Sequence, residues 1–352
     1  MLDIKPISEC HWDIVSLGEV MLRFDPGDDR IHTARSFRVW EGGGEYNVAR
    51  NLAKCFRQRA AIVTALADNQ IGRLVEDLIM HGGVDVSEIV WRDTDGISRS
   101  VRNGMYFMER GFGMRTPKGC SDRGNTAIAQ LKPGDIDWEN IFVKRRTRWF
   151  HTGGIFAGLS GSTVEAAAEA MGKARASGTV VSYDLNYRES LWSVRGGRDA
   201  ANEANQRLLP FADVVFGLEN FDSHLSKYSE KLFRDSAEKM IDRHPNIKVL
   251  ATTLRDVTSA SKHSIGGVCY YDGSVFRSKD YLDVEVLDRV GSGDAFAAGS
   301  IVGWLNGLEI QKSIEIAAAS AVLSMASVGD GLSSTADEIE RLASSGHAHA
   351  LR

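Results

Sequence analysis

The segment Asp288–Gly299 (DRVGSGDAFAAG) places two glycines, a serine and an aspartate where a strand-like stretch gives way to a helical pattern. Gly291, Ser292 and Gly293 leave backbone N–H groups free at a helix start, where the hydrogens and the helix dipole attract an oxyanion. Asp294 follows directly. Its carboxylate could cap the helix, or it could take a proton from a hydroxyl group that attacks a phosphate.

A second glycine run begins at Gly42 and precedes a helical pattern that contains Asn47. Gly42 and Gly43 allow the backbone to approach a polyhydroxy ligand, and the Asn47 amide offers both a donor and an acceptor. A plain glycine turn with a solvated asparagine fits the same residues. A dinucleotide fingerprint is disfavoured because Asn47 replaces its third glycine, and no GxxxxGK[ST] phosphate loop is present.

The elements that must position these residues alternate between strand and helix. Strand-like segments lie at 14–24, 60–67, 179–185, 213–216 and 248–252, and helical periodicity lies at 45–57, 71–81, 162–177, 233–243, 294–305 and 313–327. Repeated strand–helix units predict a mainly parallel sheet with helices on both faces, and ligands bind at the carboxyl ends of such strands.

Two strand-like segments, about 30–42 and 98–123, do not fit this alternation. We expect them to form a small β-sheet that stands off the main domain as a lid. No Pro- or Ser-rich linker divides the chain, so residues 1–340 are expected to form one α/β domain. Residues 341–352 are expected to be a mobile tail.

Composition excludes several classes of protein. The chain is 43% hydrophobic and 25% charged, and its formal net charge of −5 gives no general electrostatic reason to bind nucleic acid or an anionic membrane. Its four cysteines form no CxxC pair, which disfavours a disulfide framework or a zinc site. The first residues lack a signal peptide's apolar core, so the expected location is the cytoplasm.

The two glycine motifs together carry a resemblance. The segment 288–299 resembles the signature DTxGAGDxFxxG of the ribokinase-like (PfkB) carbohydrate kinases, with Arg289 in place of Thr, and 42–49 resembles that family's GGxxxNxA. The resemblance runs from about residue 13 to residue 329. It implies a ribokinase-like three-layer α/β/α fold and a sugar kinase that uses ATP and Mg²⁺. Asp294 would be the catalytic base, and the backbone of Gly291–Gly293 would stabilise the transferring phosphoryl group.

Within that family, Asp184–Arg188 (DLNYR) with a following Leu-Trp resembles a segment of the 2-keto-3-deoxygluconate kinases. This implies that Asp184, as a metal-site residue, and Asn186 face the nucleotide phosphates or magnesium. Arg188 would bind a sugar-acid carboxylate or a phosphate with its planar fork.

The lid region carries the same resemblance with one departure. Tyr106 stands where that subfamily's lid strand has a substrate-contacting tyrosine, and Arg123 stands where it has the arginine of a Tyr-x-Arg pair. Ser121 occupies the place of the aromatic residue of that pair, so the substrate is less well specified than the fold.

The nucleotide side departs from the family further. The magnesium-linked NxxE motif reads Leu218 to Phe221, which leaves Glu219 as a replacement that would act through water. Thr253 and Arg255 are expected to contact phosphates. The polar residues 256–264 that follow are interpreted as an insert that covers the adenine or contacts a partner.

These observations predict ATP-dependent phosphorylation of a primary hydroxyl of a small sugar acid, with 2-keto-3-deoxygluconate as the preferred substrate. The alternatives are a kinase for fructose, ribose or a related ketose, and a sugar-binding regulator whose kinase site has degraded. A homo-oligomer, a dimer through the exposed lid strands, is also expected.

Overall fold

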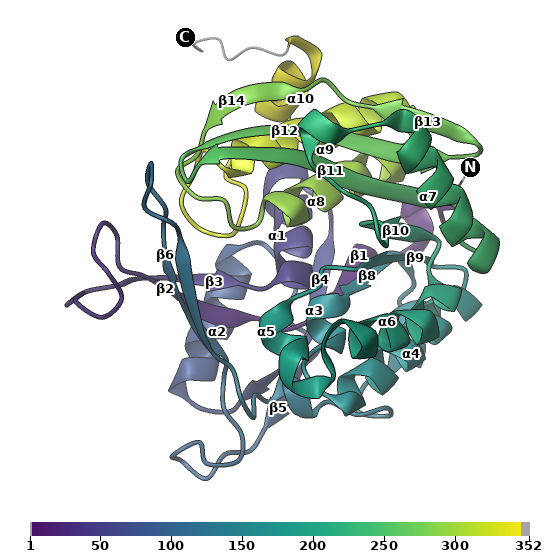
Figure 1. Cartoon of the computed structure of the whole chain (residues 1–352). Coiled ribbons are helices and arrows are strands. Elements are labelled where there is room, and N and C mark those ends of the chain that lie inside the picture. Colours follow the sequence, from purple (N-terminus) through teal and green to yellow (C-terminus); the bar gives the residue numbers. More distant parts are fainter. Residues whose placement is uncertain (1, 346–352) are drawn as a thin grey trace.

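A computed structural model describes residues 2–345 of the chain. Its main sheet has ten strands in the order β13-β12-β11-β10-β9-β8-β1-β4-β5, with β14 paired to β12 (Figure 1). The strands are β1 (Trp12–Leu17), β4 (Ala60–Ala67), β5 (Ile89–Arg92), β8 (Thr147–Gly153), β9 (Val180–Asp184), β10 (Val214–Phe216), β11 (Val249–Ser259), β12 (Lys262–Tyr271), β13 (Ser274–Arg277) and β14 (Tyr281–Glu285). Neighbours from β11 to β5 are parallel, and antiparallel strands complete the β11 edge.

The central strands are buried along nearly their whole length because both faces of the sheet are covered. In β4 (AAIVTALA) every residue is buried. Successive side chains point to opposite faces, so Val214 and Phe216 enter one core while Val215 enters the other. This is the continuous apolar pattern expected of a parallel sheet between two helical layers.

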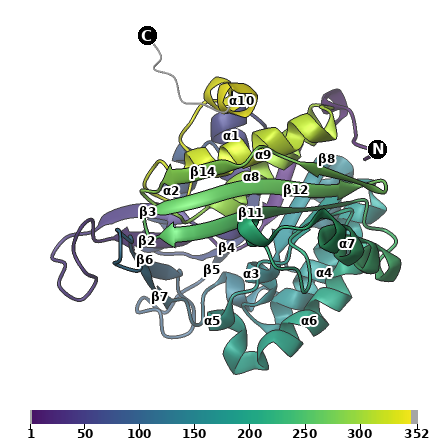
Figure 2. The same ribbon diagram turned by 45° about the horizontal axis from the view of Figure 1, so that its top comes forward.

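Helices cover the two faces of the main sheet (Figures 1 and 2). One face carries α1 (Gly44–Phe56), α2 (Gln70–His81), α8 (Ser292–Leu305), α9 (Ile310–Ser324) and α10 (Ala336–Ser345). The other carries α3 (Gly154–Ala157), α4 (Gly161–Ala176), α5 (Glu189–Trp192), α6 (Gly197–Leu208) and α7 (Glu230–Arg243). The expected mobile tail is wrong for residues 341–345, because Leu342 and Ala343 are buried at the end of α10. Residues 346–352 lie outside the described residues.

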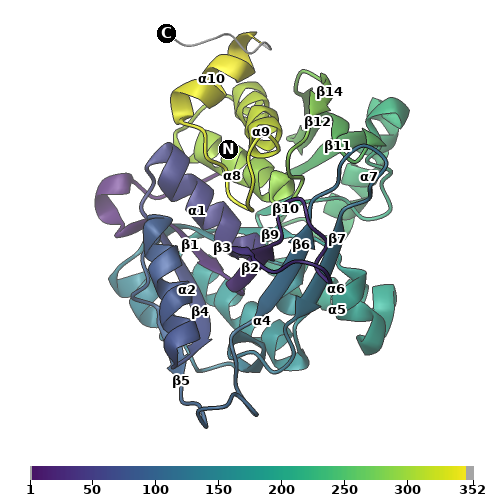
Figure 3. The same ribbon diagram turned by 90° about the vertical axis from the view of Figure 1, so that its left-hand side faces the viewer.

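A second, four-stranded sheet stands off the main one, in the order β3-β2-β6-β7 (Figure 3). We call it the lid sheet. Its strands are β2 (Met21–Asp25), β3 (Arg38–Gly42), β6 (Met105–Glu109) and β7 (Lys118–Asp122). The expected lid is confirmed, with one correction. The strand expected at 14–24 divides at Gly18, and its second half joins the lid.

The polar insert expected at 256–264 takes the form of the tip of the β11–β12 hairpin, and its role stays a prediction. These residues continue the two strands and form the hairpin tip, with Asp256 opposite Ser264. Their polarity fits the partial exposure of the tip rather than a loop. The backbone N–H of Ala260 donates to the Gly113 carbonyl oxygen at 2.9 Å, so the hairpin tip contacts the turn of the lid.

Candidate active site

Helix α8 begins with open hydrogen-bond donors. Gly291 is its N-cap residue, with a φ of 80°, and no side chain caps the helix. The first N–H groups of a helix have no partner within it, so those of Ser292, Gly293 and Asp294 are available to an anion. We call residues 288–293 the anion loop. The backbone geometry is compatible with the expected oxyanion site, which stays a prediction.

Asp294 does not cap its own helix. It is the third residue of α8, and its Oδ2 accepts a hydrogen bond from Nδ2 of Asn47 at 2.7 Å. Oδ1 of Asn47 in turn accepts the backbone N–H of Gly43 at 3.3 Å. The two glycine motifs predicted from sequence therefore meet at one carboxylate, and the alternative of a helix cap is excluded.

The electrostatics around Asp294 favour its protonated form. Burial is the largest cause and raises the pKa of Asp294 to about 8, and the nearby Asp184 carboxylate adds to this. The hydrogen bond from Asn47 and the charge of Arg188 act in the opposite direction. A carboxyl group with a pKa near neutrality suits proton transfer.

Gly42 and Gly43 are required by close packing. A Cβ on Gly43 would overlap the carbonyl oxygen of Glu19, and one on Gly42 would overlap the Asp330 carboxylate and the Tyr106 hydroxyl. The sequence predicts that these glycines let the backbone approach a ligand closely. In the structure, the atoms that crowd them belong to the protein.

Asp184 and Asn186 lie at the carboxyl end of β9, beside Asp294. Oδ1 of Asp184 accepts the backbone N–H of Asn186 at 3.1 Å. Burial raises the pKa of Asp184 to about 6. Gly44 lies within contact range of both the Asn186 amide and the Asp294 carboxylate, so these predicted site residues are brought together.

Three arginines lie near one another, and one of them, Arg188, is close enough to this carboxylate pair to affect the pKa of both groups. The pKa of the half-buried Arg255 is lowered by burial and then by the charges of Arg289 and Arg188. Within residues 2–345, none of these three guanidinium groups forms an ion pair or a side-chain hydrogen bond. Thr253 precedes Arg255 on β11 and is only partly buried. The cluster is suited to a bound anion.

Glu219 is not brought to this site. Its Oε2 lies 2.8 Å from Nη2 of Arg243, on the outer helix α7. Phe221 packs edge-on against Phe233, and Leu218 is also packed against the apolar core. The residues that replace the family's NxxE motif therefore serve packing and an ion pair. Among residues 2–345, no group of three or more His, Cys, Asp or Glu side chains is placed to hold a metal ion.

Arg123 and Tyr106 are engaged by carboxylates of the protein. Arg123 forms an ion pair with the buried Glu19, whose Oε1 has no hydrogen-bond partner in the part of the chain that the structure describes. Tyr106 donates its hydroxyl hydrogen to Asp330. The structure thus places both predicted substrate-binding residues beside the site while giving each a protein partner.

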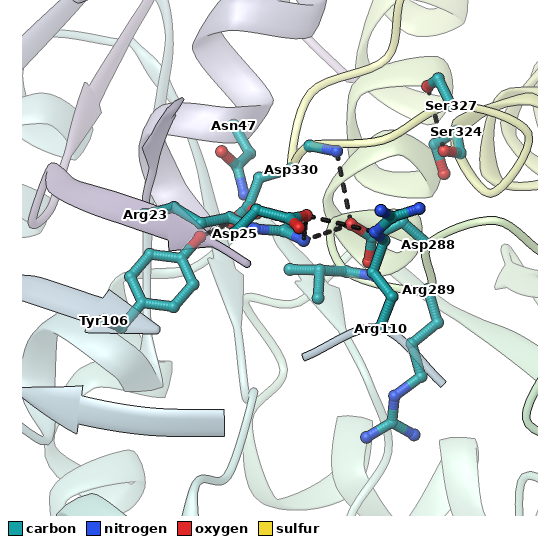
Figure 4. Close-up of polar contacts among 12 residues, drawn as sticks. Arg23, Asp25, Asn47, Tyr106, Arg110, Asp288, Arg289, Ser324, Ser327 and Asp330 are labelled. Atoms are coloured by element: carbon teal, nitrogen blue, oxygen red, sulfur yellow. Dashed lines mark hydrogen bonds and ion pairs between the residues drawn. The ribbon is translucent and has the colours of Figure 1, made fainter. Parts of the chain in front are cut away.

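Several buried charged residues at the site were not predicted from sequence. Glu45, next to Asn47 in α1, has a pKa raised to about 7 by burial, and its Oε1 accepts the N–H of Phe156 at 3.0 Å. Arg23 on β2 is fully buried among Asp25, Asp288 and Asp330 (Figure 4). A charged residue inside the apolar stretch MLRF of β2 was the signal that could have identified Arg23.

Over residues 2–345, no helix combines the length and the apolar character that a bilayer crossing requires.

Comparison with known proteins agrees with this geometry. Residues 145–337, more than half of the chain, match the model of the pfkB family carbohydrate kinases. A 2-dehydro-3-deoxygalactonokinase of Haloferax volcanii is 28% identical over 96% of this chain and 98% of that protein. A 5-dehydro-2-deoxygluconokinase of Clostridium perfringens is 29% identical over 90% of this chain and 88% of that protein.

A solved structure supports the same assignment. The crystal structure of the 2-dehydro-3-deoxygluconokinase of Thermotoga maritima superposes with a TM-score of 0.84 at 32% identity and covers 94% of this chain and 99% of that one. The matched region includes the anion loop and Asp294. The chain belongs to the PfkB family of carbohydrate kinases and has its ribokinase-like fold.

Proposed function

We propose that the chain transfers the γ-phosphate of ATP to a primary hydroxyl group of a small sugar acid, with 2-keto-3-deoxygluconate as the preferred candidate. The observation that carries this proposal is the placement of Asp294. Its buried carboxylate lies at the open N-terminus of α8 and is held there by Asn47 at 2.7 Å. A base and an anion site are thereby adjacent.

The proposed step is an in-line transfer. The Asp294 carboxylate accepts the proton of the sugar hydroxyl as its oxygen forms a bond to the γ-phosphorus. The bond from the γ-phosphorus to the oxygen that bridges it to the β-phosphorus breaks, and ADP leaves with that electron pair. The N–H groups of the anion loop stabilise the negative charge on the phosphoryl oxygens.

Residues around Asp294 are suited to bind the other charged groups of the reaction, which are the nucleotide phosphates and magnesium. Arg255 and Arg289 have no anion partner among residues 2–345 and would bind phosphate oxygens, with Thr253 and Asn186 as neighbouring donors. Asp184 is the residue that would hold magnesium, because an oxygen donor and retained water and phosphate ligands suit this ion. Bound magnesium would supply positive charge to the phosphates. Glu219 is engaged by Arg243 and is not proposed as a ligand.

Two observations favour a sugar acid. Arg188 lies close enough to Asp294 and Asp184 to affect the pKa of both, and it has no anion partner among residues 2–345. A carboxylate on the substrate would supply one. The relatives from Haloferax volcanii, Clostridium perfringens and Thermotoga maritima are named as kinases of dehydro-deoxy galactonate or gluconate.

One observation favours a neutral sugar instead. Arg123, the second candidate for the carboxylate, is already paired with Glu19, and the free Glu19 Oε1 is an acceptor suited to a sugar hydroxyl. A kinase for a neutral ketose is therefore the second candidate.

An ADP-release assay with ATP and Mg²⁺ separates these candidates. The panel contains 2-keto-3-deoxygluconate, its galactonate epimer, fructose, ribose and a blank without sugar. Turnover on the keto-deoxy acids alone supports the proposal, and turnover on fructose or ribose alone supports the second candidate. A folded sample that binds ATP and releases no ADP with any sugar contradicts both.

A further inference from the structure

One buried arginine joins the lid sheet to the anion loop. Arg23 on β2 has no exposed surface and forms ion pairs with three carboxylates from three separate segments (Figure 4). Its Nη2 lies 3.2 Å from Oδ2 of Asp25 and also contacts Asp288, and its Nη1 lies 2.7 Å from Oδ1 of Asp330. A planar guanidinium can bridge several carboxylates in this way, whereas a lysine ammonium cannot reproduce the fork.

Two of these carboxylates flank the anion loop. Asp288 is its first residue, and its side chain accepts the backbone N–H groups of Val290 at 3.1 Å and of Gly329 at 3.3 Å. Asp330 packs against the loop from the other side, since a Cβ on Gly291 would overlap the Asp330 carbonyl oxygen. Arg23 therefore holds the two segments between which the anion loop is formed.

The remaining contacts of the network belong to the lid. Asp25 ends β2 and also pairs with Arg110, just beyond β6, at 3.3 Å. Tyr106 on β6 donates its hydroxyl hydrogen to Asp330. Two lid strands thus end on the same charged groups that hold the anion loop. The lid cannot move away from α8 without separating these buried charges.

Separating them is unfavourable, because the network is nearly neutral only as a unit. Two guanidinium groups, Arg23 and Arg110, face the carboxylates of Asp25, Asp288 and Asp330, and all three carboxylates are buried. Removal of one partner from a buried ionic group leaves uncompensated charge, which destabilises the arrangement strongly.

We propose that Arg23 is a positioning residue that couples the closure of the lid over the sugar to the shape of the anion loop that receives the phosphate. The proposal rests on the proposed function for its ligands, while the coupling itself is a property of the chain. Sugar and ATP then bind cooperatively, because each stabilises the arrangement that the other requires, and the coupling acts equally in both directions.

Amide hydrogen exchange tests the coupling without requiring activity. In Arg23→Met we expect exchange to accelerate together in the lid residues 105–122 and in the anion loop 288–293, by roughly threefold or more. Arg30→Met is the matched control, because Arg30 pairs with Glu109 within the lid at 2.8 Å and makes no contact with the anion loop. Its effect should stay within the lid. The exchange rates of Arg23→Lys in both segments should lie between those of wild type and Arg23→Met.

A binding measurement distinguishes positioning from general destabilisation. With the sugar that the panel identifies, wild type should bind a non-hydrolysable ATP analogue more tightly in the presence of sugar, and Arg23→Met should lose that gain. If Arg23→Met does not fold, two other variants take its place. Tyr106→Phe removes the hydrogen bond from the lid to Asp330, and Arg110→Met removes the ion pairs of Arg110 with Asp25 and Asp28. Each should accelerate exchange in the anion loop. The proposal is overturned if amide exchange changes only in the lid, either in Arg23→Met or in both Tyr106→Phe and Arg110→Met. Failure of the kinase assignment would appear separately, as no ADP release by wild type.

Discussion

The side-chain amide of Asn47 lies 2.7 Å from the carboxylate of Asp294, although the two residues are 247 positions apart. Each comes from the first turn of a helix that follows a glycine run, and helices α1 and α8 pack against each other. The hydrogen bond turns the carboxylate away from the N–H groups of its own helix. Those donors consequently remain open for an anion, which neither motif could ensure alone.

Replacing Asp294 by Asn tests the base assignment. Asp294→Asn removes the proton acceptor and nearly preserves the shape of the side chain, so kcat should fall by about a thousandfold or more. Binding of ATP and sugar, measured by calorimetry, should be retained. Asp242→Asn on the exposed surface of α7 is the matched control and should leave kcat unchanged. Near-normal turnover of Asp294→Asn would falsify the assignment.

The pH profile should report the same carboxyl group. The pKa of Asp294 in the free protein is raised to about 8, chiefly by burial, and a base must be deprotonated to act. The value of kcat/KM should therefore rise with pH through about 8. Asn47→Ala removes a hydrogen bond that lowers this pKa, so the rise should move upward by about one pH unit. A profile that does not move on this substitution would contradict the pairing.

Stability should respond to pH with a defined sign. The pKa of Asp294 is raised from 3.8 to about 8 in the folded chain, so the folded state binds this proton more tightly than the unfolded state. The stabilisation is complete below about pH 4 and is lost as the pH rises toward 8. In Asp294→Asn no group titrates at this position, so the stability of the variant does not fall for this reason. Its melting temperature should exceed that of wild type by about 2 °C or more at pH 8.5 and show no gain at pH 4.5. Differential scanning calorimetry without ligands measures both, and an equal shift at the two pH values would exclude this cause.

The parts of the fold that depend on local pattern were predictable. The apolar run at 60–67 coincides with β4, and the glycine-flanked aspartate lies at the start of α8 as expected. Asp272 and Gly273 form the two-residue turn between β12 and β13, with φ values of 48° and 74°, as an Asp-Gly pair favours. In each case a few adjacent residues determine the geometry, so a single sequence contains the necessary information.

The parts of the fold and of the site that depend on distant partners were not predictable from the sequence. Glu219 follows its strand as predicted, yet Arg243 from α7 draws its carboxylate away. Residues 256–264 are polar enough for a loop, and only their pairing across the hairpin makes them strands. Arg23 was not predicted because two of its three partners, Asp288 and Asp330, lie near the other end of the chain and meet it only in the fold.

The arginines beside the anion loop should contribute to the binding of ATP. Arg289→Ala and Arg255→Ala should raise the KM for ATP, and the half-buried Arg255 should have the larger effect, roughly tenfold, because water screens an exposed charge. Added salt should weaken ATP binding less in Arg289→Ala than in wild type. Arg207→Ala, which removes the surface ion pair with Glu165, is the control and should leave the KM for ATP unchanged. Unchanged KM values in both test variants would show that the nucleotide lies elsewhere.

The two candidate carboxylate ligands should separate by mutation. Arg188 has no anion partner among residues 2–345, whereas Arg123 is held by Glu19. A substrate carboxylate therefore gains a new charge-assisted contact at Arg188, but at Arg123 it must compete with a carboxylate already in place. We expect Arg188→Ala to raise the KM for 2-keto-3-deoxygluconate by roughly tenfold or more and to affect a neutral sugar much less.

Arg123→Ala should raise the KM for both kinds of sugar by a similar factor, since it releases the buried Glu19 and disturbs the site without regard to substrate charge. Steady-state kinetics on an acid and a neutral sugar measure both ratios. Equal effects of Arg188→Ala on the two sugars would remove the argument for a sugar acid, and selective loss of the acid in Arg123→Ala would transfer the role to that residue.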